Sequence, residues 1–129
     1  MKKSIMILIA FAVLLSLCAC HTYGTKPDDV SQAHYEYGKK ALDIADQYLD
    51  GRISAEDADR RLGNLYDYGR GSLPETEYGE PTHNKDFSVE HNVVMLHIEV
   101  SSIAFGTGSE SEFIGFRNDL AKALNERER

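Results

Sequence analysis

Residues 48–58, YLDGRISAEDA, contain the end of one helix and the start of the next. Gly51 follows a polar residue at a point where a glycine can end a helix, because glycine adopts the left-handed backbone conformation without steric cost. Ser54 is a favoured N-cap residue, and Asp57 lies three residues later, where a capping box places an acidic side chain. This short connection predicts two helices that fold back as a hairpin.

Apolar side chains recur at helical spacing on both sides of this junction. Steps of three and four residues place them along one face of each helix. We therefore expect a helical hairpin over residues 29–69, with Asp28 or Asp29 available to cap its first helix. The expected core face consists of Val30, Ala33, Tyr37, Ala41, Ile44, Tyr48, Ala58, Leu62 and Leu65.

Residues 86–105 fit two patterns. Apolar residues at steps of four and three indicate a helix, whereas alternating apolar residues at 94–100 are typical of a strand. The run has no turn signal over a length that exceeds ordinary strands, and a strand at residues 93–100 would lack an evident partner. We therefore predict a helix and keep the strand as the alternative. The helical face would contain Val89, Val93, Leu96, Val100 and Ile103.

A second hairpin is expected over residues 86–128. The sequence GTG at residues 106–108 interrupts the chain, and Ser109 begins a second capping box. The apolar face then continues with Phe113, Phe116, Leu120, Ala121 and Leu124. Because the segment 70–85 is rich in glycine and proline, it is expected to be a loop. The predicted fold is all-α, with two helical hairpins forming a small four-helix arrangement in a single domain over residues 29–129.

The N-terminus has the order of features found in an export signal. Lys2 and Lys3 precede an apolar run that ends at Leu17, and polar residues follow from His21. This run is shorter than the roughly 20 apolar residues that a transmembrane helix needs. We expect a signal peptide at residues 1–19 and a polar tether at residues 20–28.

The tetrad LCAC at residues 17–20 contains the only two cysteines and resembles the lipobox of bacterial lipoproteins. The resemblance implies that Cys20 carries an acyl group such as palmitate and that the chain is cut just before it. Cleavage before Cys18 is the alternative. The junction at residues 48–58 is also similar to a helical element found in small uncharacterised bacterial lipoproteins, which implies a fold element and no activity. A lipoprotein would lie on the extracytoplasmic side of the bacterial cell membrane.

The net charge of the chain limits the kinds of partner that we expect. The signal carries two lysines and no acidic residue, so its removal changes the formal net charge from −7 to −9. This acidic chain has no basic stripe for nucleic acid, and the lipid must attach it to the membrane. We expect a non-catalytic binding module for an unidentified protein or envelope partner, with Tyr66, Tyr68 and Tyr78 as possible contacts. An inhibitor or immunity protein against a cationic enzyme or toxin is the sharper alternative.

No catalytic motif is visible, so neither an enzyme nor a cofactor is expected. The serines lie in no nucleophile elbow, and the GTG sequence lacks the lysine of a phosphate-binding loop. A metal-binding protein that uses His83, His91 and His97 is the remaining alternative.

Overall fold

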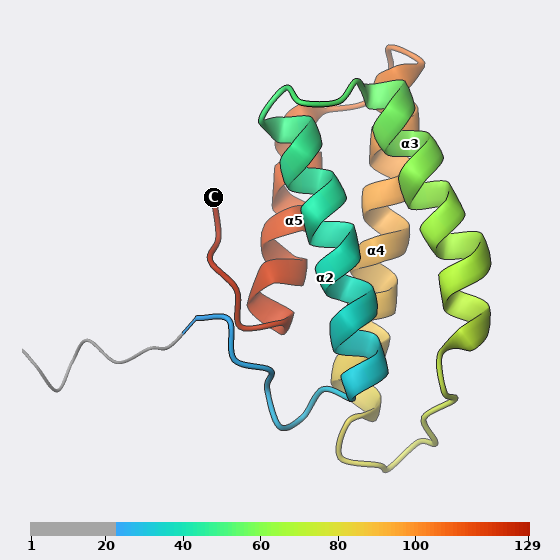
Figure 1. The fold of residues 1–129 in the computed structure, drawn as a ribbon, viewed down its shortest axis with the longest axis vertical. Helices are drawn as coiled ribbons and strands as arrows, with labels where there is room; N and C mark the ends of the chain where they lie inside the picture. The colour runs from blue at the N-terminus through green and yellow to red at the C-terminus, as the bar shows by residue number, and fades with distance from the viewer. Residues whose placement is uncertain (1–22) are drawn as a thin grey trace, which may run out of the picture.

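The helix signals in the sequence correspond to four helices (Figure 1). The structure is a computed structural model that describes residues 23–129, so the predicted signal peptide, Cys18 and Cys20 lie outside the described residues. The helices are α2 (Gln32–Leu49), α3 (Ala55–Asn64), α4 (His83–Ala104) and α5 (Glu110–Ala123). Residues 23–129 contain no strand, and the predicted all-α fold of two hairpins in a four-helix arrangement is confirmed.

The junction between α2 and α3 forms as its sequence predicts. Gly51 has a φ of +70°, in the left-handed region where a glycine is favoured. The Ser54 hydroxyl accepts a hydrogen bond from the backbone N–H of Asp57 at 3.2 Å, which satisfies one free donor in the first turn of α3. Local chemistry therefore fixes this turn.

The start of α2 differs from the expectation. Ser31 caps the helix by accepting a hydrogen bond from the backbone N–H of His34 at 3.3 Å, so neither Asp28 nor Asp29 is the N-cap. The backbone N–H of Ser31 itself donates to Asp86 Oδ1 at 2.9 Å, and Asp86 lies on α4. A carboxylate from the second hairpin thus completes the start of the first hairpin.

The chain continues in helical turns beyond α3. A π-helical turn, η1 (Leu65–Gly69), is followed by a 3₁₀ turn, η2 (Arg70–Ser72). A Cβ atom on Gly69 would lie 3.0 Å from the ring of Tyr37, so this glycine allows the turn to approach α2 closely. The segment without regular helix spans residues 73–82 and is shorter than the expected loop of residues 70–85.

The ambiguous segment at residues 93–100 is helical, as predicted. It lies in the middle of α4, whose residues Val89, Val93, Leu96 and Val100 are all completely buried. The steps of three and four residues therefore decide the structure, and the alternation that suggested a strand does not.

The start of α5 repeats the arrangement seen at α2. The Ser109 hydroxyl accepts from the backbone N–H of Glu112 at 3.3 Å, as the capping box predicts. The backbone N–H of Ser109 does not pair with Glu112, however, but donates to the carboxylate of Glu99 on α4. Both serine caps, at α2 and at α5, are thus completed by an acidic side chain of α4.

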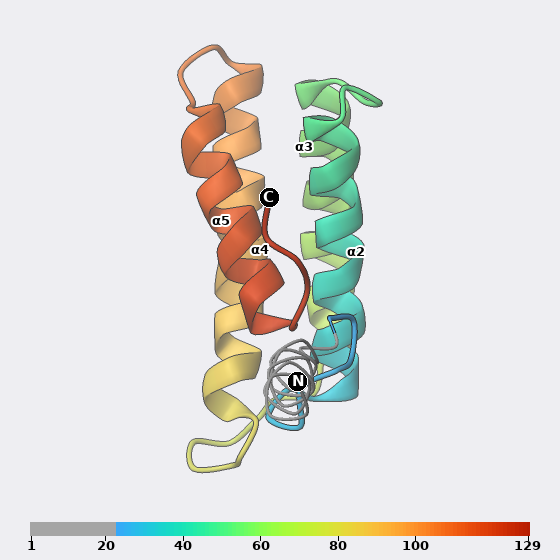
Figure 2. The same cartoon turned by 90° about the vertical axis from the view of Figure 1, so that its left-hand side faces the viewer.

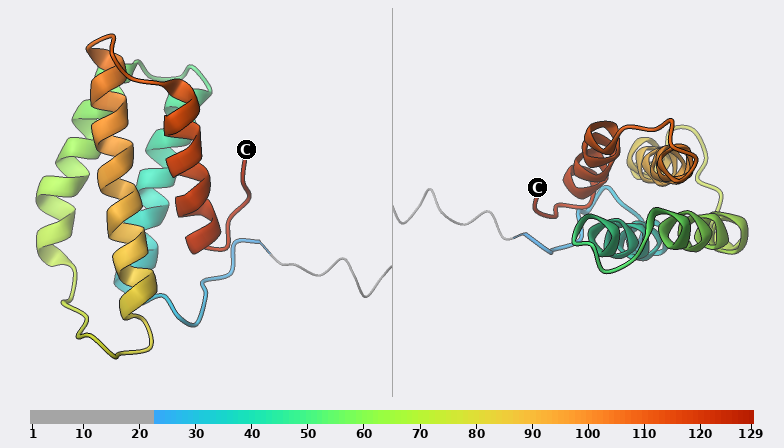
Figure 3. Two further views of the ribbon diagram at one scale, coloured as in Figure 1. Left: turned by 180° about the vertical axis from the view of Figure 1, so that it is seen from behind. Right: turned by 90° about the horizontal axis from the view of Figure 1, so that it is seen from above.

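The two hairpins pack as two layers, α2 with α3 and α4 with α5 (Figures 2 and 3). Between them, the ring of Phe113 on α5 meets Tyr48 on α2 edge-on, with 5.2 Å between ring centroids. Each helix contributes most of its predicted apolar face to one core, to which Ala33 does not belong. The largest fully buried apolar side chains are Phe113, Leu62, Leu96, Leu120 and Leu124.

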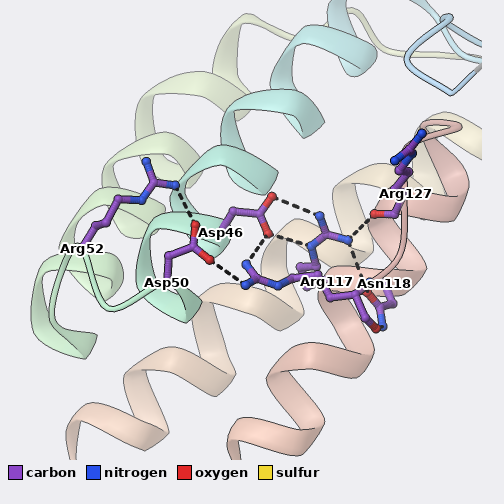
Figure 4. A network of polar contacts seen from close by, with 7 residues as sticks. Asp46, Asp50, Arg52, Arg117, Asn118 and Arg127 are labelled. Carbon is purple, nitrogen blue, oxygen red and sulfur yellow. Dashed lines mark hydrogen bonds and ion pairs between the residues drawn. The ribbon is translucent and has the colours of Figure 1, made fainter.

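A network of ion pairs fixes the C-terminal segment against α2 (Figure 4). Arg117 on α5 donates to both oxygens of Asp46, with Nε–Oδ1 at 2.9 Å and Nη2–Oδ2 at 3.0 Å. Its Nη1 donates to the backbone oxygen of Arg127, and Arg129 pairs with Asp46 and Asp50. Because Arg117 is only 6% exposed, this two-pronged pair is partly shielded from water.

Candidate functional site

An open pocket of about 740 Å³ lies at the end of the bundle where η1, η2, the segment 73–82 and the first turns of α4 meet. Its lining combines aromatic and charged side chains, including Tyr66, Arg70, His83, Phe87 and Glu90. This volume is within the range of small-ligand sites, and the mixed lining suits a partner with both apolar and charged groups.

Arg70 organises the polar side of the pocket. Its Nε donates to Glu90 Oε2 at 3.2 Å, and its Nη1 donates to the Tyr66 hydroxyl at 2.8 Å. The guanidinium also lies 5.4 Å from the ring centroid of Tyr66, at cation–π distance. The hydrogen bond with Glu90 and the neighbouring Tyr66 raise the pKa of Arg70 above its ordinary value. The three side chains are therefore joined by hydrogen bonds and form a charged wall of the pocket.

A buried histidine contacts the Glu90 carboxylate of this wall from the protein interior. His34 is completely buried, with Nε2 at 2.9 Å from Glu90 Oε1 and Nδ1 at 2.7 Å from the Ser31 hydroxyl. Asp86, also completely buried, has Oδ2 at 3.5 Å from His34 Nδ1. Since both ring nitrogens are engaged and no surface is exposed, His34 positions Glu90 and cannot itself reach a ligand in the pocket.

Tyr37 adds a second buried polar group close to this network. The side chain is 4% exposed, and its hydroxyl has no hydrogen-bond partner among the described residues. Burial, together with the nearby charge of Glu90, raises the pKa of Tyr37 to about 12. The neutral phenol is therefore the form that the folded protein accommodates.

Replacement of Tyr37 by phenylalanine is expected to stabilise the protein by about 1 kcal/mol at pH 8, because it removes an unpaired buried hydroxyl. In the native protein, the ordinary pKa of 10.0 rises to about 12 on folding, so stability is retained below pH 10 and lost as the pH rises towards 12. The advantage of Tyr37→Phe should therefore grow by about 1.4 kcal/mol at pH 11. Urea unfolding of both proteins at the two pH values measures this difference.

Burial also raises the pKa of Tyr35 and of Tyr48, so some alkaline destabilisation is expected in both proteins. The informative quantity is the difference between the two unfolding free energies. A difference that stays constant from pH 8 to pH 11 would contradict the assignment to Tyr37.

The three tyrosines predicted as contacts have different environments. Tyr66 lines the pocket. Tyr68 on η1 is 80% exposed and follows Asp67, which also lines the pocket. Tyr78 in the segment 73–82 is 93% exposed, and its ring meets His83 edge-on at 5.7 Å between centroids. The structure thus places one tyrosine in the pocket and the other two beside residues that line it.

The three histidines proposed as metal ligands are not brought together. His83 Nδ1 lies 2.8 Å from the backbone oxygen of Thr76, and His97 Nε2 lies 3.2 Å from Asp59 Oδ1. The ring of His91 stacks on Phe87. Within residues 23–129, no group of three or more His, Cys, Asp or Glu side chains could hold a metal ion. This part of the chain therefore gives the metal hypothesis no support.

No known protein family, curated protein or solved structure matches the chain. None of the helices within residues 23–129 has the length and apolar character needed to cross a membrane.

Sequence reasoning identified Tyr66 but missed the polar network that shapes this pocket. Arg70, Glu90 and His34 come from η2, α4 and α2, and no local pattern links them. One signal was available, since Asp86 and Glu90 are four residues apart on α4, beside the apolar positions Val89 and Val93. Two acidic groups on the core side of a helix require buried partners, which here are His34 and the N-terminus of α2.

Proposed function

We propose that this chain is a lipid-anchored, non-catalytic binding module on the extracytoplasmic side of a bacterial membrane, and that the pocket bounded by residues 66–90 receives its partner. The observation that carries the proposal is the pocket itself, with Tyr66 and Phe87 among charged side chains held in place by Arg70 and Glu90. An arrangement that is fixed before binding loses little conformational entropy on association, which favours recognition.

The charge of this region favours a basic partner. Residues 66–90 contain six acidic and two basic side chains, a formal charge of −4. Asp67, Glu75 and Glu90 line the pocket, and Arg70 is already paired with Glu90. Complementary charge accelerates encounter and excludes acidic competitors. Inhibition of, or immunity to, a cationic enzyme or toxin is therefore the second candidate function.

Site-specific photocrosslinking tests the proposal. We expect p-benzoylphenylalanine at position 78 to give a reproducible covalent adduct when membranes of the native host are irradiated. The matched control is the same amino acid at position 105, where Phe105 is 82% exposed but lies at the turn between α4 and α5. Adduct formation at position 78 should fall as ionic strength rises, because salt screens attraction between exposed charges.

Identical adducts at positions 78 and 105, or no reproducible adduct at position 78, would argue against the pocket as the binding site. The intact mass of the protein recovered from the same membranes tests the anchor separately. A mass that fits an acylated chain beginning at Cys20 would support the proposed processing. A mass that fits an acylated chain beginning at Cys18 would place the cleavage site before Cys18. A mass without an acyl group would contradict the proposed lipid anchor.

A further inference from the structure

The chain is attached to the folded domain almost as soon as the described residues begin. The backbone N–H of Gly24 donates to the backbone oxygen of Asn125 at 2.9 Å, and Asn125 Nδ2 donates to the backbone oxygen of Thr25 at 3.2 Å. The Tyr35 hydroxyl donates to the backbone oxygen of Gly24 at 3.1 Å. The described part of the expected tether at residues 20–28 is thus bound to the end of α5 and to α2 (Figure 1).

These contacts shorten the connection between the proposed lipid and the domain. Gly24 lies four positions after Cys20, and a fully extended chain over four such steps reaches about 14 Å. The 22-residue helix α4 alone is about 33 Å long. A domain of this size held within 14 Å of its lipid has to place the surface around Gly24 next to the bilayer.

The exit of the chain and the pocket lie toward the same end of the bundle, near the start of α4, but on different sides of it (Figure 1). Residues 23–25 leave beside α5 and α2, whereas the pocket is formed by the chain after α3, the segment 73–82 and the start of α4. Seen along the bundle, α5 and α3 occupy opposite corners, and the first described residues lie on the side away from α3 (Figure 3).

From this placement we infer that the anchor holds the edge containing Tyr23 and Arg127 against phospholipid headgroups, and that the pocket opens away from the bilayer. The inference rests on the proposed lipid anchor at Cys20. In this orientation the edge containing Tyr23 and Arg127 is the surface that contacts the membrane. The pocket is then accessible to partners that approach from the aqueous side.

The chemistry of the two sides agrees with this orientation. At the exit, Arg127 lies 5.5 Å from the ring centroid of Tyr23, which is 50% exposed. Tyrosine rings and cationic side chains suit the interface, where one part of each residue meets acyl chains and the other meets phosphate and water. The pocket side, with its formal charge of −4 over residues 66–90, is repelled by anionic headgroups.

Fluorescence quenching in vesicles tests the orientation. Full-length protein purified from membranes is labelled at Glu128→Cys or at Glu77→Cys, both exposed positions, and reconstituted into phosphatidylethanolamine–phosphatidylglycerol vesicles with a headgroup-attached spin label as quencher. We expect quenching to be several-fold stronger at position 128, beside the chain exit, than at position 77, beside the pocket. Protein without the introduced cysteine controls for labelling at other sites.

A ten-residue Gly-Ser insertion between Thr22 and Tyr23 is the second arm, since a flexible linker of that length lets the domain turn. It should reduce the difference between the two positions. Equal quenching at both positions, stronger quenching at position 77, or a difference that the insertion leaves unchanged would overturn the orientation. Failure of the protein to float with the vesicles would instead remove the lipid anchor, and the orientation with it.

Discussion

Replacement of Phe113 by alanine is expected to lower the free energy of unfolding by about 3 to 5 kcal/mol, the range for removing a large buried aromatic side chain. Phe113 is completely buried and contacts Tyr48 across the two hairpins, so the cavity would open between the layers and not at an edge. The edge-on ring pair adds to the loss, because such pairs stabilise beyond their buried area. Chemical denaturation followed by circular dichroism measures the change.

Phe105→Ala is the matched control for this measurement. Phe105 is 82% exposed, so the same chemical change should alter stability by less than about 0.5 kcal/mol. If both substitutions had similar effects, Phe113 would not be the central contact between the hairpins.

Replacement of Arg117 by methionine is expected to destabilise the protein by about 3 kcal/mol, because it leaves Asp46 without its bidentate partner. Asp46 is 29% exposed and retains its contact with Arg129, which limits the loss. The same change removes the hydrogen bond to the backbone of Arg127, so carboxypeptidase should digest the C-terminal segment faster than in the native protein. Urea unfolding and timed proteolysis measure the two effects.

Arg52→Met provides the comparison. Arg52 pairs with Asp50 at 3.0 Å, but its side chain is 57% exposed, and exposed ion pairs contribute less than about 1 kcal/mol. If Arg117→Met destabilised the protein no more than Arg52→Met, the shielding of the Arg117 pair would be without energetic consequence.

Local signals in the sequence predicted most of the fold. Gly51, Ser54 and Ser109 act within one or two turns of their own position, so their residue types are sufficient to place the helix ends. The helix at residues 93–100 was predicted from length and from the lack of a strand partner, and its buried residues follow the helical steps. These inferences succeed because capping and amphipathic spacing involve near neighbours.

Contacts between distant residues account for what the sequence did not predict. Ser31 replaces Asp28 or Asp29 as the cap of α2. Its backbone N–H donates a hydrogen bond to the carboxylate of Asp86, which lies 55 residues further along the chain. His34 meets Glu90 across 56 residues. In the pocket, Tyr66 was identified from its type alone. The pairing of Arg70 with Glu90 was not predicted, because it depends on how α4 docks.

The two carboxylates of α4 that complete serine caps also affect how the protein unfolds. Asp86 accepts a hydrogen bond from the backbone N–H at the start of α2, and Glu99 accepts one at the start of α5. Neither cap is therefore complete until α4 has packed against the rest of the fold. Each donor would otherwise lose a hydrogen bond to a charged acceptor, a type of bond that contributes about 1.5 to 3 kcal/mol. The Asp86 contact therefore couples the two hairpins in their unfolding, whereas the Glu99 contact couples the two helices of the second hairpin. We therefore expect the fold to unfold as one cooperative unit and not as two independent halves.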